Sequence, residues 1–438
     1  MSNNCMRLLI LLFCCFSGFA TAQSYEKLYS DYRGSLYQIR LIEKSSNSKA
    51  GLGSGFQISA NGLIATNYHV VAEAVGDPDK YQLEYLSVDG KQGSLTLLDI
   101  DVVNDLAILR QDQPGPEYLQ LAEVTPQKGE TIFSLGNPLD LGMTLIPGTY
   151  NGIAGGSFYD RIHFSGSINP GMSGGPAINA QGKVVGINVA TAGNQVSFLV
   201  PVDKLARLYK SFLAQGDKKV DLQAVTHRQL LANQNAIITQ ILNAEWKPRA
   251  LGEAMVVGEI VPAIQCWGNT QEEDDNPVTR IDKGCTGQDV VYLSEDFNTG
   301  RVEYEFFWLQ AENLQPSRFY SEYEQQMSNF YPGNNAGEDD VTNYHCNQAF
   351  TSQPRVRGPA TKVEEEEKPP KQQGPVIART SYCVRRYKEF PDLYDIFYLS
   401  LSVDQKNRAL VSHFTLSGFT QESAEAFTEK FTSEIQWH

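Results

Sequence analysis

Between residues 35 and 200, the chain is divided into short apolar or alternating runs separated by Gly, Asn-Gly or Asp-Gly turns. Runs of this length, bounded by turn residues, are typical of β-strands. Many short strands joined by frequent turns predict an all-β barrel or sandwich for this part of the chain. The runs lie at residues 36–42, 55–59, 63–66, 81–88, 94–99, 106–109, 131–135, 161–164, 176–179, 184–189 and 196–200.

Helical patterns flank this strand-rich region. Residues 24–33 have aromatic and leucine side chains at helical spacing, and residues 202–214, closed by Gly216, have the pattern of a helix with a glycine stop. Residues 221–245 are rich in Leu, Ala, Gln and Asn and predict a helical connector. A terminal helix is expected over residues 421–435, with its apolar residues on one face.

Two β-hairpins are predicted in the C-terminal half. The turn-like segment FNTG at residues 297–300 predicts a hairpin between residues 290–293 and 301–309. A second hairpin is expected between residues 395–403 and 409–416. Together with the terminal helix, these strands predict a small α+β domain.

The chain of 438 residues is longer than one hydrophobic core usually organises, so at least two domains are expected. We expect a signal peptide at 1–22, a mainly β domain at 23–210, a helical connector at 211–250 and an α+β domain at 251–438. Residues 353–376 are rich in proline and charge and predict a disordered, solvated loop within the last domain. A metal or partner role for its acidic run is the less favoured reading.

The first 22 residues have the pattern of a secretory signal. Arg7 precedes the apolar run 8–16, and Ala20-Thr21-Ala22 offers a small-x-small cleavage site. The run is too short to span a bilayer, and no later stretch is apolar enough to cross one. We therefore expect an exported protein, periplasmic or extracellular, with no stable membrane insertion. The formal net charge of −15, with no basic stripe, argues against a nucleic-acid partner.

Four cysteines remain once the signal is removed, and all lie in the C-terminal half. An even number in an oxidising compartment indicates two disulfides, for which three pairings exist. We favour Cys266 with Cys285 and Cys346 with Cys383, because each pair closes a local loop. Zinc is the alternative, but no C-x2-C or C-x2-H spacing supports it, so no metal or other cofactor is expected.

Three residues, in chain order, predict a catalytic triad: His69, Asp105 and Ser173. A serine hydroxyl needs an adjacent base, histidine has a suitable pKa, and a carboxylate orients the imidazole. The glycines around Ser173 allow successive backbone amides to converge on a carbonyl oxygen that gains charge. We expect the N–H groups of Gly171 and Ser173 to form this oxyanion hole, with Met172 as a further contributor.

The segments around these residues resemble the trypsin-like serine peptidases, above all their HtrA/Deg branch. They read TNYHVV at 66–71, NDLA at 104–107, LGNP at 135–138, INPGMSGGP at 168–176 and GKVVGIN at 182–188. The resemblance covers roughly residues 24–210 and implies two perpendicular β-barrels with the triad in the cleft between them. The expected fold class is therefore mainly β, a trypsin-like double barrel followed by a smaller, disulfide-bearing α+β domain.

Two departures from that family pattern stand out. Met172 occupies a position where the branch usually has Asn and trypsin has Asp, so activation by pairing a new amino terminus with this residue is excluded. HtrA-type enzymes usually carry PDZ domains after the peptidase domain. In their place this chain has the cysteine-bearing domain, whose role the sequence does not assign.

The resemblance also implies a substrate pocket. Ser167, six residues before the nucleophile, occupies the position at the base of the S1 pocket, and without a carboxylate there, cleavage after Arg or Lys is not expected. Asn188, Val189 and Ala190 occupy the pocket wall, where glutamate-specific relatives have a histidine. A small or medium apolar residue is therefore expected before the scissile bond.

The N-terminal tyrosines Tyr25, Tyr29 and Tyr32 have two readings, because HtrA-type enzymes often trimerise through aromatic residues near the N-terminus. They form either a homo-oligomer contact or a packing contact with the chain's own barrel.

The leading functional hypothesis is an exported serine endopeptidase that acts on protein or peptide substrates through an acyl-enzyme. The alternative is a latent or non-catalytic binding or chaperone-like protein that acts through its C-terminal domain. A cell-surface adhesin has the least support.

Overall fold

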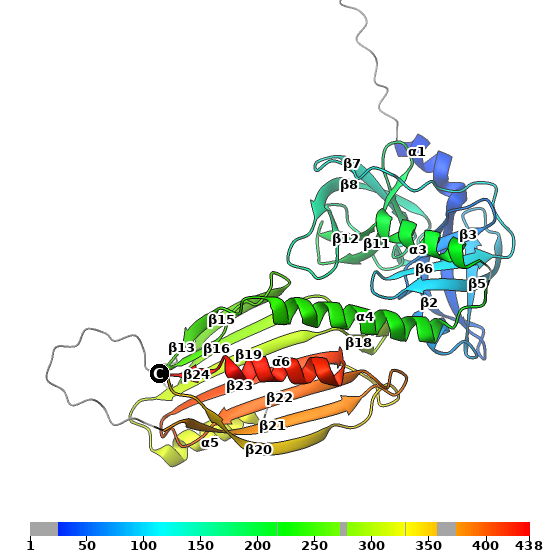
Figure 1. Cartoon of the computed structure of the whole chain (residues 1–438). Coiled ribbons are helices and arrows are strands. Elements are labelled where there is room, and N and C mark those ends of the chain that lie inside the picture. The colour runs from blue at the N-terminus through cyan, green and yellow to red at the C-terminus, as the bar shows by residue number, and fades with distance from the viewer. Residues whose placement is uncertain (1–24, 217, 272–277, 329, 357–373) are drawn as a thin grey trace, which may run out of the picture.

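The computed structural model describes residues 25–216, 218–271, 278–328, 330–356 and 374–438. It contains two barrels in the N-terminal part and a broad sheet in the C-terminal part, joined by a long helix (Figure 1). The expected signal peptide at 1–22 and most of the expected loop at 353–376 lie outside the described residues.

The first barrel closes six antiparallel strands in the order β1-β2-β3-β6-β5-β4. Every residue of its strand β3 is buried, whereas strand β4 has both buried and half-buried residues. The strands are β1 (Leu36–Glu43), β2 (Ser48–Gln57), β3 (Leu63–Thr66), β4 (Tyr81–Ser87), β5 (Gln92–Asp101) and β6 (Leu106–Gln111). A short helix, α2 (Ala72–Gly76), follows β3.

The second barrel closes six further strands in the order β10-β11-β12-β9-β8-β7. Its strands are β7 (Thr131–Gly136), β8 (Thr144–Ile153), β9 (Ile162–Phe164), β10 (Pro176–Ile178), β11 (Val184–Thr191) and β12 (Ser197–Pro201). A 3-10 turn, η2 (Pro138–Asp140), follows β7. The expected mainly β double barrel is confirmed.

Two helices pack against the outside of the barrels. In α1 (Tyr25–Tyr32), Leu28 is buried, and the Tyr25 ring contacts Phe133 of the second barrel with 5.3 Å between centroids. A 3-10 turn, η1 (Arg33–Ser35), leads from α1 into β1. Tyr25 thus packs against the chain's own barrel, which is one of the two alternatives for the N-terminal tyrosines. The oligomer contact stays a prediction. Helix α3 (Val202–Gln215) ends at Gly216, as the glycine stop predicts, with its N–H on the Phe212 carbonyl.

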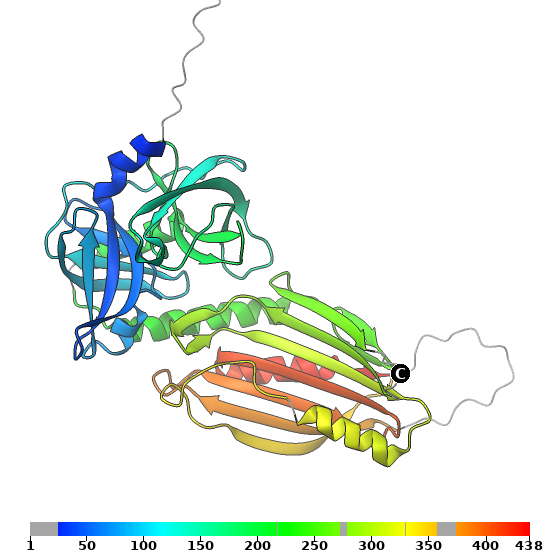
Figure 2. The same ribbon diagram turned by 180° about the vertical axis from the view of Figure 1, so that it is seen from behind.

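The C-terminal part is built on one seven-stranded antiparallel sheet in the order β15-β16-β19-β23-β22-β21-β20. Helices α4 (Leu222–Asn243) and α6 (Gln421–Ser433) cover one face, and α5 (Pro316–Met327) packs on the other (Figures 1 and 2). The strands are β15 (Ile264–Gln271), β16 (Val278–Gly287), β19 (Val302–Ala311), β20 (His345–Gln353), β21 (Val376–Arg386), β22 (Tyr394–Ser402) and β23 (Arg408–Phe419).

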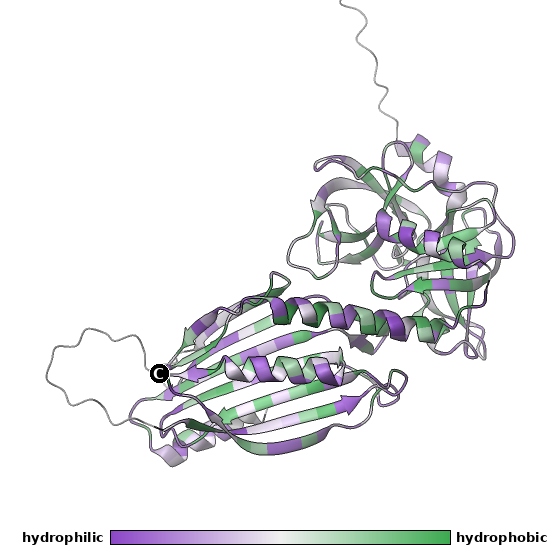
Figure 3. Ribbon diagram, in the orientation of Figure 1, coloured by the Kyte–Doolittle hydropathy of each residue, from purple (hydrophilic) through white to green (hydrophobic). Residues whose placement is uncertain are grey.

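Residue type explains which side of the sheet each side chain takes. Hydrophobic and hydrophilic residues alternate along the strands, as Figure 3 shows, because successive side chains point to opposite faces. Between α6 and the sheet, the rings of Phe427 and Phe431 from α6 pack with the ring of Phe414 from β23, with 5.1–5.9 Å between ring centroids. The prediction of a terminal helix with Ala424, Phe427 and Phe431 on its buried face is therefore confirmed.

The two predicted hairpins have different outcomes. The second is confirmed, since β22 pairs with β23 from Tyr394 opposite Phe419 to Leu401 opposite Val411. The first is wrong: β17 (Val291–Ser294) pairs with β18 (Phe297–Thr299), whereas β19 pairs with β16 and β23. The chain turns at residues 295–296, so the FNT segment is a strand, and Gly300, at φ +83°, redirects the chain into β19.

A smaller three-stranded sheet closes one end of this part of the molecule. Its order is β13-β14-β24. It joins β13 (Pro248–Leu251) and β14 (Ala254–Val257) to the C-terminal strand β24 (Gln436–Trp437).

The two disulfides secure opposite edges of the large sheet. Cys266–Cys285 joins edge strand β15 to β16, and Cys346–Cys383 joins edge strand β20 to β21, each between directly paired residues. Both predicted pairings are confirmed. Strand β20 is exposed along almost its whole length, so burial contributes little to holding it. The covalent links therefore stabilise strands that would otherwise be free to fray.

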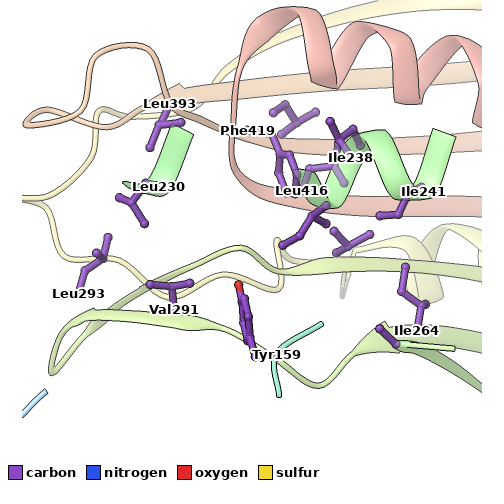
Figure 4. Packing of buried hydrophobic residues seen from close by; sticks show 14 of the residues in the cluster. Tyr159, Leu230, Ile238, Ile241, Ile264, Val291, Leu293, Leu393, Leu416 and Phe419 are labelled. Carbon is purple, nitrogen blue, oxygen red and sulfur yellow. The ribbon is translucent and has the colours of Figure 1, made fainter. Parts of the chain in front are cut away.

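The barrels and the C-terminal sheet share one apolar cluster. It runs from Ile100 and Val71 of the first barrel to the α4 side chains and the sheet. Figure 4 shows Tyr159, from the loop between β8 and β9, among Val291, Leu230 and neighbouring side chains of this cluster. Residues 222–243 of the expected connector therefore form a packed helix that belongs to the core of both parts.

Candidate active site

His69 and Asp105 meet in the first barrel. His69 follows β3, and Asp105 lies in the turn between β5 and β6. The Asp105 carboxylate accepts two hydrogen bonds from His69: from the backbone N–H at 2.9 Å and from ring Nδ1 at 2.7 Å. Asp105 has φ +61°, a left-handed conformation that aspartate adopts more readily than most residues. The Asn67 side chain holds this turn by donating to the Asp105 carbonyl at 2.7 Å.

The surroundings of His69 shift its protonation. Burial disfavours the charged imidazolium, but the charge of Asp105 and its hydrogen bond outweigh this effect, so the pKa of His69 is raised above 6.5. Because Nδ1 donates to Asp105, the neutral ring presents Nε2 as its proton acceptor. The side chain remains 27% exposed, so the ring is accessible.

Ser173 lies in the turn that precedes β10 of the second barrel, and this turn packs against the His69 segment. The Ser173 carbonyl accepts a hydrogen bond from the Ser54 N–H at 2.7 Å. Gly174 has φ +82°, and a Cβ there would lie 2.9 Å from the Asn67 nitrogen and closer still to Ser54 and Thr66. Only glycine fits so close an approach. Within the described residues, no hydrogen bond joins the Ser173 hydroxyl to His69, and such bonds commonly tighten when substrate binds.

The three expected oxyanion donors are not equivalent. The Met172 N–H donates to the Asn169 carbonyl at 3.0 Å and is therefore occupied. In the described part of the chain, the N–H groups of Gly171 and Ser173 have no backbone acceptor. Gly171 has φ +92°, and a Cβ at this position would collide with the Asn137 carbonyl. The loop thus leaves two amides free and uses the third to close its turn.

The Met172 side chain anchors the loop. It is 0% exposed and packs in the core of the second barrel with Ile132, Phe164 and neighbouring residues. A polar or acidic residue there would need a hydrogen-bond partner, whereas methionine needs only apolar contacts.

Ser54 is a site residue that the sequence analysis did not assign. Its hydroxyl donates to the Gly171 carbonyl at 2.7 Å and accepts the Asn137 N–H at 2.9 Å. Its backbone N–H holds the Ser173 carbonyl. One residue of the first barrel thereby fixes both ends of the loop that carries Ser173. The Gly-Ser-Gly segment in which it lies was the available signal.

The expected pocket residues fall into two groups. Ser167 and Val189 are partly exposed and Ala190 is exposed, so all three are accessible from solvent. Asn188 is 0% exposed, and its side chain is held by Ser134 at 2.8 Å and by the Leu135 and Met172 carbonyls at 2.9 and 3.2 Å. The expected substrate-binding role of Asn188 is therefore corrected: its side chain supports the Ser173 loop and does not line a pocket.

The C-terminal part also reaches this site. The Tyr292 ring, from β17, contacts the His69 ring edge-on, with 5.9 Å between centroids. Burial, with the negative charges of Glu73, Glu295 and Asp105, raises the pKa of Tyr292 to about 12, so its phenol stays neutral. No local pattern in the sequence indicates this contact.

Within residues 25–216 and the further described ranges, no three His, Cys, Asp or Glu side chains are grouped to hold a metal ion. Of the helices that the structure describes, none is long and apolar enough to cross a membrane.

Residues 53–187 match the family model described as a trypsin-like peptidase domain. The N-terminal part of this chain is therefore similar to the trypsin-like serine peptidases of the HtrA branch. This chain is 30% identical over 208 residues to zebrafish (Danio rerio) serine protease HTRA1B, a match that covers 45% of this chain and 42% of the relative. It is 28% identical over 265 residues to a probable periplasmic DegP-like serine endoprotease of Chlamydia pneumoniae, covering 55% and 53%.

Solved structures also match part of this chain. The serine endoprotease from Yersinia pestis is 25% identical, with a TM-score of 0.39, and the match covers 44% of this chain and 68% of that one. Deg5 is 27% identical, with a TM-score of 0.37, covering 42% and 90%. This chain spans about half the length of the curated relatives that it matches.

Proposed function

We propose that the protein is a serine endopeptidase whose catalytic triad is His69, Asp105 and Ser173. The observation that carries the proposal is the His69–Asp105 pair, bonded at 2.7 Å beside the turn that bears Ser173. The first barrel presents the ring of His69, whose side chain is 27% exposed. The second barrel presents Ser173 in a turn in which Gly171 and Gly174 both have positive φ. The relatives named as serine proteases support the same assignment.

The proposed reaction follows from these groups. His69 Nε2 takes the proton of Ser173 as its oxygen attacks the scissile carbonyl, and it then delivers that proton to the leaving amine. Asp105 holds the ring in the required tautomer and stabilises the imidazolium. The N–H groups of Gly171 and Ser173 bind the oxyanion, while Met172 holds the loop in place. Water then hydrolyses the acyl-enzyme, with His69 acting again as base.

The substrates are proteins or peptides with a small or medium apolar residue before the scissile bond. Ser167, which has no charge, stands at the position of the pocket base, and Val189 and Ala190 contribute the wall. A peptide library tests this preference, and efficient cleavage only after Arg, Lys or Glu would contradict it.

We further propose that the protein is exported. Two disulfides favour an oxidising compartment, and DegP-like relatives are named as periplasmic. Detection of the protein, cleaved after Ala22, in the periplasmic or extracellular fraction checks this. The peptidase domain is proposed to span residues 23–210 and the C-terminal domain 251–438.

The deciding experiment uses an active-site fluorophosphonate probe and unfolded casein. Wild-type protein is expected to be labelled and to cleave casein, and Ser173→Ala to do neither. Ser211→Ala serves as the matched control, because this serine is exposed on α3 and the variant keeps the nucleophile, so labelling is expected to be retained. Absence of wild-type labelling under all conditions would favour the alternative, a latent binding or chaperone-like protein.

A further inference from the structure

The β17–β18 hairpin of the C-terminal domain lies directly against the segment that carries His69. Strand β17 contacts α2, the short helix after His69. At the hairpin turn, the Glu295 N–H donates to the Glu73 carboxylate of α2 at 3.3 Å. Three residues before Glu295, Tyr292 places its ring against His69.

The hairpin is held in this position from three sides. Val291 and Phe297 are buried in the shared apolar cluster, and the Phe297 ring contacts Tyr387 at 4.8 Å between centroids. At the base of the hairpin, Asp289 accepts hydrogen bonds from the Ser157 hydroxyl at 2.9 Å and the Phe158 N–H at 2.6 Å, both in the second barrel. The hairpin therefore belongs to a fixed surface and is not a loose loop.

Tyr292 combines a packed ring with an unengaged hydroxyl. The side chain is half-buried, and among the described residues its hydroxyl has no hydrogen-bond partner. At 5.9 Å the two rings are in contact, because aromatic pairs pack with centroids 4.5–7 Å apart. A third ring does not fit between them, so a large substrate side chain is excluded from this side of His69.

We propose that Tyr292 is a specificity-determining residue, which forms the wall of the substrate cleft beside His69 and restricts that subsite to small side chains. The inference rests on the proposed peptidase function and assigns part of the substrate-binding cleft to the C-terminal domain. The substrates that fit are extended polypeptides with Ala, Ser or Gly at the position next to His69.

Kinetics on matched peptides test the assignment. Each position from three residues before to two residues after the scissile bond is changed in turn from Ala to Trp, and the Trp/Ala ratio of kcat/KM is measured. In Tyr292→Ala the ratio is expected to rise about tenfold at one position only, because the ring no longer fills that space. Tyr292→Leu is expected to give a smaller rise at the same position, and Tyr292→Phe to keep the wild-type ratio.

The control is Tyr331→Ala, which removes an exposed tyrosine elsewhere in the same domain and should leave every ratio unchanged. Unchanged ratios in both Tyr292→Ala and Tyr292→Leu, or an equal change at all positions, would overturn the proposal. If Tyr292→Ala does not fold, Tyr292→Leu decides alone. If the wild-type protein is labelled by fluorophosphonate but the Tyr292 variants keep its Trp/Ala ratios, only this inference is refuted. If the wild-type protein is neither labelled nor active, the peptidase function is refuted and the subsite with it.

Discussion

His69 of the barrels is partly exposed and His413 of the C-terminal sheet is buried, and the two parts of the molecule shift the histidine pKa in opposite directions. Burial acts against the charged form of both. Beside His69, the Asp105 carboxylate reverses the effect and raises the pKa. His413, on β23, is 2% exposed and packs against the rings of Phe330 and Phe397, and burial lowers its pKa to about 4. Glu305 lies 3.8 Å from its ring, but the neutral imidazole does not form an ion pair with it.

The same difference extends to the surroundings of each histidine. Around His69, buried polar side chains such as Asn67 and Asn188 are used to hold loops in place by hydrogen bonds. Around His413, aromatic rings supply the contacts, and two disulfides join the edge strands of the same sheet to their neighbours. Burial alone lowers the pKa of His413, whereas the hydrogen-bonded Asp105 carboxylate raises the pKa of His69. The following experiments test this contrast.

The largest effect is expected from Asp105→Asn. This change removes the charge and leaves the amide to bond the wrong tautomer of His69, so kcat/KM should fall about 10⁴-fold, equivalent to about 5 kcal/mol. In wild-type protein, His69 must be neutral to act as base. Because its pKa is raised, activity should decline with falling pH from a midpoint above 6.5.

Asp101→Asn is the matched control, because Asp101 lies in the same turn region but bonds Asn104 and not His69. A pH–activity profile of wild type and both variants measures the effect. An acid midpoint at or below pH 6 in the wild type would contradict the raised pKa.

Loss of a disulfide is expected to have the next largest effect, confined to the C-terminal sheet. The two bonds span sequence separations of 19 and 37 residues, so their removal should lower the free energy of unfolding by about 3 and about 4 kcal/mol. Thermal unfolding of Cys266→Ser/Cys285→Ser and Cys346→Ser/Cys383→Ser measures it. Fluorophosphonate labelling, as the barrel readout, should survive in both, and its loss would show that the two parts unfold together.

His413 predicts acid sensitivity of the C-terminal sheet. Its native pKa of about 4 lies below the unfolded value of 6.5, so the unfolded state binds the proton first and stability falls as pH drops from 6.5 to 4. The lost stability is about 3 kcal/mol. His413→Gln removes this term, so its advantage over wild type should grow as pH falls through this range.

Denaturant titrations at pH 7 and pH 4.5 measure that difference directly. Burial raises the pKa of the neighbouring Glu305, and this carboxyl therefore stabilises the native state as pH falls, opposite to His413. Because both proteins contain Glu305, the difference in stability between His413→Gln and wild type isolates the effect of His413. The exposed His345→Gln is the control. Equal pH dependence of His413→Gln and wild type would show that His413 is charged when folded.

The smallest effect is expected where the two parts meet. The Gln229 side chain, on α4, donates to the Ile100 carbonyl at 2.9 Å and accepts the Val102 N–H at 2.8 Å, on the segment that leads to Asp105. Gln229→Ala should cost about 1 kcal/mol of stability. It should also lower kcat more than it raises KM, because the turn bearing Asp105 loses a support. Gln223→Ala, at an exposed position of the same helix, is the control. Equal stability, kcat and KM in the two variants would show that α4 does not support the turn that bears Asp105.

The double barrel was implied by the resemblance to trypsin-like peptidases, since local pattern predicted only a barrel or a sandwich. Local pattern was sufficient for the disulfide pairings, the terminal helix and the hairpin of β22 and β23. Each of these depends on residue types within a short stretch or on a loop closed by nearby cysteines. The first hairpin failed for the same reason. FNTG has turn-forming residues, but Phe297 is buried against Tyr387, which is distant in the sequence and follows β21, and the segment is a strand. Asn188 was misassigned because its buried partners come from β7 and the Ser173 loop.

Residue type and short-range spacing carry the chemical groups, the order in which His69, Asp105 and Ser173 occur, and the glycines that permit the turn after Met172. Three features became visible in the folded chain and not before. Ser54 secures the Ser173 loop, Met172 packs in the core of the second barrel, and Tyr292 of the C-terminal part lies beside His69. These are contacts between segments far apart in the chain, and they arise because packing of one shared apolar cluster brings those segments together.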